Sequence, residues 1–216
     1  MVKRIVCFGD SNTWGYNAED GTRFSEEVRW PCLLQKYLGS EYQVIEEGLS
    51  GRTSVVDDPL FEGLKGYDYL LPCLRSHSPV ERVIIMLGTN DTKERFNLTP
   101  YNIAQGITRL ALRAKEVLKE INETPFELLV VAPPPIGKAY ANTEISHSMG
   151  KDCNVKSEKF PGYLKVMLAE NAIDFIDTKG NISMNNIDYM HLDAEGHELL
   201  AKFIFNKIKG KNRGGK

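Results

Sequence analysis

The sequence lacks most features of membrane, disulfide-bonded and nucleic-acid-binding proteins. No segment approaches the ~20 consecutive apolar residues that a membrane-spanning helix requires. The four cysteines, Cys7, Cys32, Cys73 and Cys153, are scattered and form no C-x-x-C pair, so we expect reduced thiols. The formal net charge of −2 gives no general attraction to nucleic acid or to an anionic membrane surface. These absences favour a globular protein that folds without disulfides and binds neither nucleic acid nor a membrane.

Motifs of cofactor and metal chemistry are also missing. The chain has no G-x-G-x-x-G or Walker A sequence for a nucleotide cofactor and no H-E-x-x-H zinc motif. His77 and His147 have no partner at ligand spacing, so we expect surface or loop positions for them. His197 is expected to face solvent or to pack locally. We therefore expect neither a cofactor nor a metal ion.

The length and the two ends of the chain indicate its domain organisation. A chain of 216 residues with 42% hydrophobic content suits one globular domain with a full core, which we assign to residues 1–208. Residues 207–216 are basic without apolar periodicity, and we interpret 209–216 as a flexible tail rather than a nucleic-acid-binding arm. The N-terminal residues show no signal-length apolar stretch and no small-residue cleavage site, which predicts a cytoplasmic protein.

Short apolar runs alternate with helical patterns along the chain. We predict strands at residues 4–8, 43–45, 82–87, 128–132 and 173–176. We predict helices at residues 33–38, 101–121 and 199–208, with Thr99-Pro100 marking the start of the second. Short β-branched runs are typical of a buried parallel sheet. The sequence thus predicts an α/β protein, a three-layer α/β/α sandwich with a central parallel sheet.

A serine follows the first apolar run directly. This run, at residues 5–8, ends in the glycine-flanked turn Gly9-Asp10-Ser11-Asn12. Most serines in such turns only hydrogen-bond their own backbone. A serine at the end of a strand can act as a nucleophile when a base takes its proton. Ser11 is our candidate nucleophile because other segments offer the partners that it needs.

The first partner segment holds Asp188 and His191, three residues apart in a loop before a helical run. Catalysis by a serine requires a base, and the base requires a partner that fixes its tautomer and stabilises the imidazolium. Both side chains can turn to one side of the loop, with Asp188 on one ring nitrogen and the other nitrogen free for Ser11. The alternative is helix capping beside a surface histidine, since D-x-x-H pairs often arise by chance.

Two further segments offer hydrogen-bond donors for an oxyanion. Negative charge develops on the carbonyl oxygen during acyl transfer, and each preorganised donor lowers the barrier by roughly 3 to 4 kcal/mol. Gly51 follows the second strand and can present an unobstructed backbone N–H. Asn90 follows the third strand and displays its side-chain amide in a turn. The alternative is that both are ordinary turn residues.

Together, these four segments resemble the four sequence blocks of the SGNH or GDSL hydrolase family, in the same order. IVCFGDSNTWG at 5–15, EEGLSGRT at 46–53 and IIMLGTNDTK at 84–93 resemble its small-ester arylesterase, acyltransferase and perhydrolase branch. The resemblance implies the flavodoxin-like fold of the family and a serine esterase. It also implies a homo-oligomer, because relatives in this branch tend to self-associate.

The resemblance assigns a role to each candidate residue. Ser11 is the nucleophile, and Asp188 and His191 complete the triad. The Ser11 amide, Gly51 and Asn90 are the oxyanion donors. His191 then deprotonates Ser11, which attacks an ester carbonyl and forms an acyl-enzyme, and water or another nucleophile releases the acyl group.

Residues around these motifs are candidates for substrate binding. Asp10, Asn12 and Trp14 flank Ser11, and Trp14 with Tyr16 either walls a small acyl pocket or belongs to the core. We expect the three charged residues after Gly51 either to form a structural ion pair or to lie at the rim of the cleft; they are Arg52, Asp57 and Asp58.

The segment 134–159 matches no family block and has no clear periodicity. Long loops are often functional. We predict that it folds over the cleft, selects the acyl or alcohol group and contributes to an oligomer contact.

Two alternatives to a small-ester esterase stay open. The first is another esterase with the same catalytic residues, either a carbohydrate O-deacetylase or a thioesterase and lysophospholipase. The second is a non-enzymatic module in which Asp10, Ser11 and Asn12 bind an anion. The order of the four segments favours an enzyme.

Overall fold

The computed structural model describes residues 2–123 and 125–213. Within this part of the chain, five parallel strands form one sheet with the order β2-β1-β3-β4-β5. The strands are β1 (Lys3–Gly9), β2 (Tyr42–Gly48), β3 (Arg82–Met86), β4 (Glu127–Ala132) and β5 (Asp174–Asp177). Each of the five predicted strands is therefore present within one to three residues of its expected ends.

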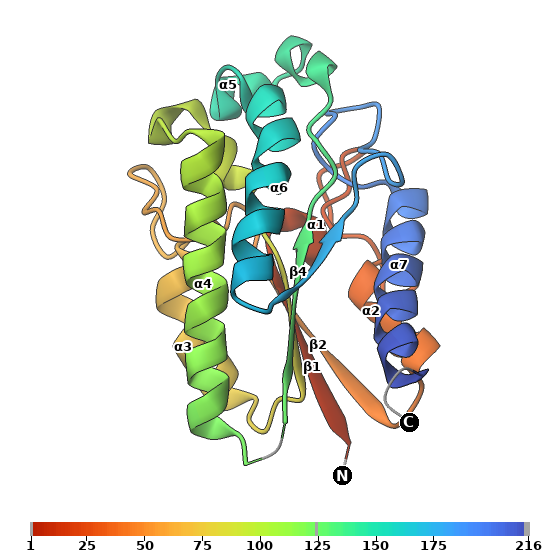
Figure 1. The fold of residues 1–216 in the computed structure, drawn as a ribbon. Coiled ribbons are helices and arrows are strands. Elements are labelled where there is room, and N and C mark those ends of the chain that lie inside the picture. Colours follow the sequence, from red (N-terminus) through yellow and green to blue (C-terminus); the bar gives the residue numbers. More distant parts are fainter. Residues whose placement is uncertain (1, 124, 214–216) are drawn as a thin grey trace.

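Helices cover both faces of the sheet (Figure 1). The helices are α1 (Ser11–Trp14), α2 (Trp30–Leu38), α3 (Gly66–Ser76), α4 (Pro100–Ile121), α5 (Ile145–Met149), α6 (Cys153–Glu170) and α7 (Ala194–Arg213). Short 3-10 turns lie at η1 (Asn90–Thr92), η2 (Glu94–Phe96) and η3 (Lys138–Asn142). One core lies between the sheet and helices α3, α4 and α6, and a second lies between the sheet and helices α2 and α7. This confirms the predicted three-layer α/β/α sandwich.

The central elements form where the sequence pattern is strongest. β1 and β3 are buried on both faces, which explains their continuous apolar runs. α4 begins at a capping box, in which the Thr99 hydroxyl accepts from the backbone N–H of Asn102 and the Asn102 side chain accepts from the backbone N–H of Thr99. The predicted start of this helix at Thr99-Pro100 is thus confirmed.

Several elements differ from the sequence prediction. We predicted no helix for α3 or α6, because Pro72 and Pro161 interrupt their helical patterns. The segment 134–159 is not one long loop, since it contains η3, α5 and the first turns of α6. The final helix continues to Arg213, so residues 209–213 of the predicted flexible tail are helical. Residues 214–216 of that tail lie outside the described residues.

The strand order determines where polar loops meet. The connection from β2 returns past β1 to β3, so the chain reverses its winding direction between β1 and β3. Parallel sheets of this order carry their sites at that switch point, outside the carboxyl ends of the strands. Ser11 follows β1, Gly51 follows β2 and Asn90 follows β3. The topology thus brings three of the sequence-predicted residues to one edge of the sheet.

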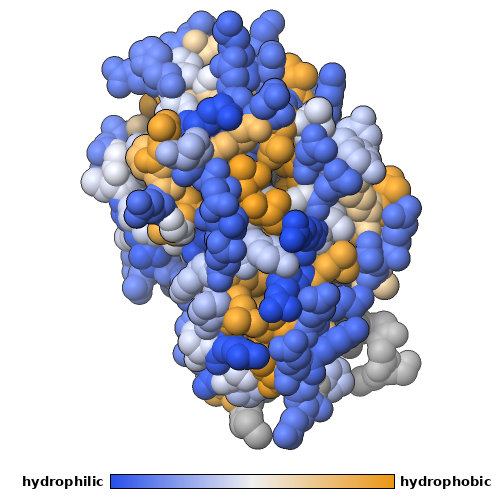
Figure 2. All heavy atoms as spheres, turned by 90° about the vertical axis from the view of Figure 1, so that its left-hand side faces the viewer, coloured by the Kyte–Doolittle hydropathy of each residue, from blue (hydrophilic) through white to orange (hydrophobic). Residues whose placement is uncertain are grey.

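In the part of the chain that the structure describes, no helix is both long and apolar enough to cross a bilayer. On the side that carries α3 and α4, hydrophobic residues form patches between hydrophilic ones (Figure 2). Large exposed apolar side chains include Tyr101 of α4 and Tyr163 of α6, whose rings meet edge to face at 5.5 Å. The expected homo-oligomer stays a prediction.

Candidate active site

Two hydrogen bonds connect Ser11, His191 and Asp188 in a line. Nε2 of His191 lies 2.9 Å from the Ser11 hydroxyl, and Nδ1 lies 2.6 Å from Oδ2 of Asp188. All three residues are buried. Ser11 is the first residue of α1, and only Asp10 separates it from the end of β1. In this arrangement the imidazole donates from Nδ1 to the carboxylate and accepts from the serine hydroxyl at Nε2. The Ser11 hydroxyl thus faces an imidazole nitrogen whose orientation the Asp188 carboxylate fixes.

The carboxylate of Asp188 is itself held by the loop. Its Oδ1 accepts from the backbone N–H groups of Met190 and His191 and from the side-chain amide of Asn185. Burial alone would raise the pKa of Asp188, but the hydrogen bond and charge of His191, with these backbone donors, lower the pKa to about 2. Asp188 is therefore ionised at neutral pH.

Asn185 is a structural residue of the site that the sequence analysis missed. Its Oδ1 accepts from the backbone N–H groups of Ile187 and Asp188, at 2.7 and 2.9 Å, and its Nδ2 also donates to the carbonyl of His191. These bonds fold the loop into a compact turn around one amide. An asparagine three residues before the aspartate is the available signal, because asparagine often holds such turns.

The side chain of Asn12 joins the first turn of the chain to this loop. Its Nδ2 donates to the Met190 carbonyl at 3.2 Å, and its Oδ1 accepts from the Leu192 N–H at 2.8 Å. These two bonds keep the loop with His191 beside Ser11. The role of Asn12 in substrate binding stays a prediction.

Asp10 and Trp14 keep their status as predicted substrate-binding residues. Oδ1 of Asp10 accepts from the Asn12 N–H, its Oδ2 is buried without a partner among the described residues, and burial raises its pKa to about 6. Trp14 is half-buried, with the Arg23 guanidinium over its ring at 5.3 Å. Tyr16 lies against the imidazole of His191, with ring centroids 4.4 Å apart. Tyr16 thus packs on the base.

A glycine on β2 allows α1 to approach the sheet. A Cβ atom at Gly48 would lie 2.2 Å from the backbone nitrogen of Trp14, far inside van der Waals contact. Only glycine at this position leaves room for the helical turn that begins with Ser11. The position of Ser11 therefore depends on the absence of a side chain on the neighbouring strand.

Two donors are available beside this turn. Gly51 has a φ of +86°, which favours glycine, and its backbone N–H has no acceptor in the described part of the chain. The Asn90 side chain is buried, and its Nδ2 has no acceptor among the residues described. A buried amide without a partner is costly in a folded protein, and a ligand oxygen can satisfy it. The Ser11 N–H, at the first position of α1, has no acceptor within that helix.

The charged residues after Gly51 have separate roles. The Arg52 guanidinium donates to the Gly9 carbonyl at 2.9 Å and to the Glu47 carbonyl, so it ties together the ends of β1 and β2. Asp57 pairs with Lys65, and Asp58 pairs with Arg95. The expected ion pair within the group Arg52, Asp57 and Asp58 does not form.

The other histidines lie apart from Ser11. His147 is exposed, as expected. His197 is fully buried and accepts from the Trp30 N–H at 3.3 Å, so it packs locally rather than facing solvent. His77 is half-buried and bonds Glu47, which corrects its expected position as an unpartnered surface residue.

The segment 134–159 supports the loop that carries His191. Ile136, Tyr140 and Met149 pack with Met190 in a small core of their own, and the Gly137 N–H donates to the Tyr189 carbonyl at 2.8 Å. A hollow of about 950 Å³ opens on the same segment, and its lining does not include Ser11, Asp188 or His191. The predicted roles of this segment in selecting substrate and in oligomer contacts stay predictions.

Comparisons with known proteins point to one family. The model of the GDSL-like lipase/acylhydrolase family matches residues 7–199. A carbohydrate acetylesterase from Sinorhizobium meliloti is 36% identical with a TM-score of 0.86, over 96% of this chain and 99% of that one. An aryl esterase from M. smegmatis is 34% identical with a TM-score of 0.86, over 97% and 99%. No curated protein matches at a significant level.

Proposed function

Because the chain belongs to the GDSL-like lipase/acylhydrolase family and is a carboxylic ester hydrolase, we propose that it cleaves small acyl esters with Ser11 as nucleophile. The observation that carries the proposal is the line of hydrogen bonds from Ser11 through His191 to Asp188. A serine, an imidazole and a carboxylate in this order are the arrangement that activates a hydroxyl for attack on an acyl carbon.

The reaction proceeds in two steps. Nε2 of His191 takes the proton of Ser11 while Oγ attacks the ester carbonyl, and the same proton then passes to the leaving alcohol. A water molecule, activated by His191, hydrolyses the acyl-enzyme. Asp188 stays ionised, fixes the imidazole tautomer and stabilises the imidazolium that forms in each step.

The oxyanion is stabilised by three N–H donors. They are the backbone N–H of Ser11, the backbone N–H of Gly51 and the side-chain amide of Asn90. The supporting observation is that the two donors beyond α1 have no acceptor among the described residues, so each is free for a negatively charged oxygen. No donor has to break an existing bond when the charge develops.

The choice of ester has two candidates. The aryl esterase from M. smegmatis supports an aryl ester, and the carbohydrate acetylesterase from S. meliloti supports an acetylated sugar. The second neighbour acts on an acetyl group, and we propose acetyl as the preferred acyl group of this chain. Transfer of the acyl group to another alcohol is part of the same proposal, because the acyl-enzyme reacts with whichever nucleophile reaches it.

The test compares hydrolysis of p-nitrophenyl acetate, butyrate and octanoate by the wild type, Ser11→Ala and His191→Ala. We expect the rate to fall with chain length and both variants to lose about a thousandfold or more in kcat. Ser40→Ala changes the same residue type as Ser11→Ala at an exposed position and should keep full activity. An organophosphonate should label Ser11 and leave Ser11→Ala unlabelled.

Two outcomes would decide against parts of this proposal. Full activity in Ser11→Ala would reject the nucleophile. Faster release of acetate from acetylated sugars than from aryl acetates would select the carbohydrate esterase as the function.

A further inference from the structure

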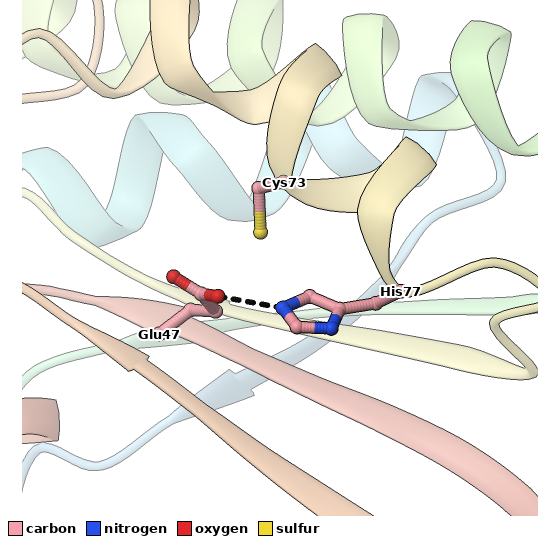
Figure 3. Close-up of side chains that lie close together, drawn as sticks. All are labelled: Glu47, Cys73 and His77. Carbon is pink, nitrogen blue, oxygen red and sulfur yellow. Dashed lines mark hydrogen bonds and ion pairs between the residues drawn. The ribbon is translucent and has the colours of Figure 1, made fainter.

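A second group of reactive side chains lies apart from Ser11, between β2 and α3 (Figure 3). Glu47 comes from β2, Cys73 from the last turns of α3, and His77 from the end of that helix. One possible ligand atom from each of the three residues lies within 4.8 Å of the other two. Across the described residues, this is the one group of three such side chains.

The positions of these side chains follow from the local structure. Cys73 and His77 are four residues apart, so they lie on the same face of α3. Glu47 projects from the neighbouring strand toward that face, and its Oε1 lies 2.7 Å from Nε2 of His77. Figure 3 shows the sulfur of Cys73 directed at this pair. The three groups therefore converge on one point.

The environment is partly closed to water. Cys73 is fully buried, and the side chains of Glu47 and His77 are 16% and 27% exposed. A buried thiol beside a carboxylate and an imidazole is an uncommon combination of polar groups for a core to enclose. The half-exposed imidazole provides a route for an ion from solvent.

The donor set is that of a zinc site. Thiolate sulfur, imidazole nitrogen and carboxylate oxygen are the three ligand types that Zn²⁺ accepts, and sites with three protein ligands leave the fourth position to water. We propose that Glu47, Cys73 and His77 bind one Zn²⁺ ion. On binding, a zinc–sulfur bond replaces the S–H bond of Cys73, whose proton passes to solvent, and His77 binds through Nε2 with its proton on Nδ1.

The neighbouring groups support such a site. The Tyr69 hydroxyl donates to Oε2 of Glu47 at 3.2 Å, which orients the carboxylate as outer partners of metal ligands do. Arg52 is the nearby cation and lies over the Tyr69 ring at 5.3 Å. One carboxylate, one thiolate and one guanidinium together leave a single negative charge for a dication. Without an ion the thiol is neutral, because burial raises the pKa of Cys73 to about 12.

The test uses the full, reduced and metal-stripped protein and titrates it with Co²⁺, which absorbs visibly and forms a thiolate charge-transfer band. We expect one Co²⁺ per chain with this band, and Zn²⁺ should displace it. Cys73→Ser should remove the band, and His77→Gln should weaken binding by at least about tenfold. Cys32→Ser and His147→Gln are the matched controls and should bind as the wild type does.

A second readout guards against variants that fold poorly. Zn²⁺ should raise the thermal midpoint of the wild type and of Ser11→Ala, and it should raise that of His77→Gln by clearly less. His77 lies at the end of α3 with its side chain 27% exposed, so we expect its replacement to keep the fold. Absence of the band in the wild type, or equal Co²⁺ binding by folded His77→Gln, would overturn the proposal. Loss of esterase activity in Ser11→Ala has no bearing on it.

Discussion

The carboxylate of Asp91 accepts hydrogen bonds from both the backbone N–H and the hydroxyl of Ser54. The backbone bond measures 3.0 Å, and both residues are fully buried. Asp91 follows Asn90 in the turn after β3, and Ser54 lies three residues after Gly51 in the turn after β2. The two turns that carry the proposed oxyanion donors are thus joined by one buried side chain.

We expect Asp91→Ala to damage both stability and activity. The Ser54 N–H would be left buried without an acceptor, which costs about 1 to 3 kcal/mol of unfolding free energy. Relaxation of the two turns would also move the oxyanion donors and lower kcat. Asp91→Asn keeps an acceptor at Oδ1 and is the matched control. Urea unfolding measures the stability, and ester hydrolysis measures the activity. An unfolding free energy of Asp91→Ala equal to that of the wild type would show that the hydrogen bonds between Ser54 and Asp91 do not stabilise the fold.

Replacing Asn90 should affect the transition state more than substrate binding. In Asn90→Ala the amide donor is lost, and we expect kcat to fall by about 10² to 10³ while KM changes little. Steady-state kinetics with p-nitrophenyl acetate measures the two constants. Asn181→Ala removes an exposed amide outside the turns that carry the proposed donors and serves as the control. A kcat close to the wild-type value would mean that Asn90 only stabilises the turn and does not stabilise the oxyanion.

Gly48→Ala tests whether the packing of α1 on β2 positions the nucleophile. The new methyl group would meet the backbone of Trp14, which no side-chain movement can relieve, so we expect both a loss of about 1 to 3 kcal/mol in stability and a loss of activity. Gly162→Ala is the control, since it lies in α6 with open space around it and should stabilise by about 0.5 to 1 kcal/mol. Relative to the wild type, we expect the thermal midpoint of Gly48→Ala to fall and that of Gly162→Ala to rise.

His197 should make stability depend on pH below neutrality. Burial, with the nearby Arg29 cation, lowers the pKa of His197 to about 3 in the folded protein, from 6.5. Between these values the unfolded chain takes up a proton that the folded protein does not, so stability falls as the pH falls below 6.5. From pH 7 to 5 this loss is about 2 kcal/mol.

His197→Gln removes this titration. Its unfolding free energy should therefore decrease less than that of the wild type over the same pH range, by the stated amount. Urea titrations at pH 5 and pH 7 provide the comparison. Identical pH dependence in both proteins would mean that the His197 ring takes up its proton as readily in the folded protein as in the unfolded chain.

The sequence predicted the sheet and the segments of the site because both depend on local patterns. The strands β1, β3 and β4 are buried apolar runs; Ser11 follows β1, Asn90 follows β3, and Gly51 follows the less buried β2. Asp188 and His191 are close enough in sequence for their contact to depend on one loop. Parallel strands then place the ends of all these segments together.

Features that depend on packing between distant segments could not be predicted. Nothing in the sequence indicated that the Asn12 amide bonds a loop 180 residues away. The helix α6 was not predicted. It contains Pro161, which disfavours a helix locally, and its packing on α4 and on the sheet stabilises it. Glu47 and His77 are 30 residues apart, and only the docking of α3 on β2 makes them neighbours.

The hydrogen bond between Ser11 and His191 joins positions 180 residues apart. Translation produces the serine long before the histidine, so a chain that ends before residue 191 has no imidazole beside its hydroxyl. With Ser11 as the proposed nucleophile, ester cleavage therefore reports only those chains whose synthesis has passed the loop with Asp188 and His191.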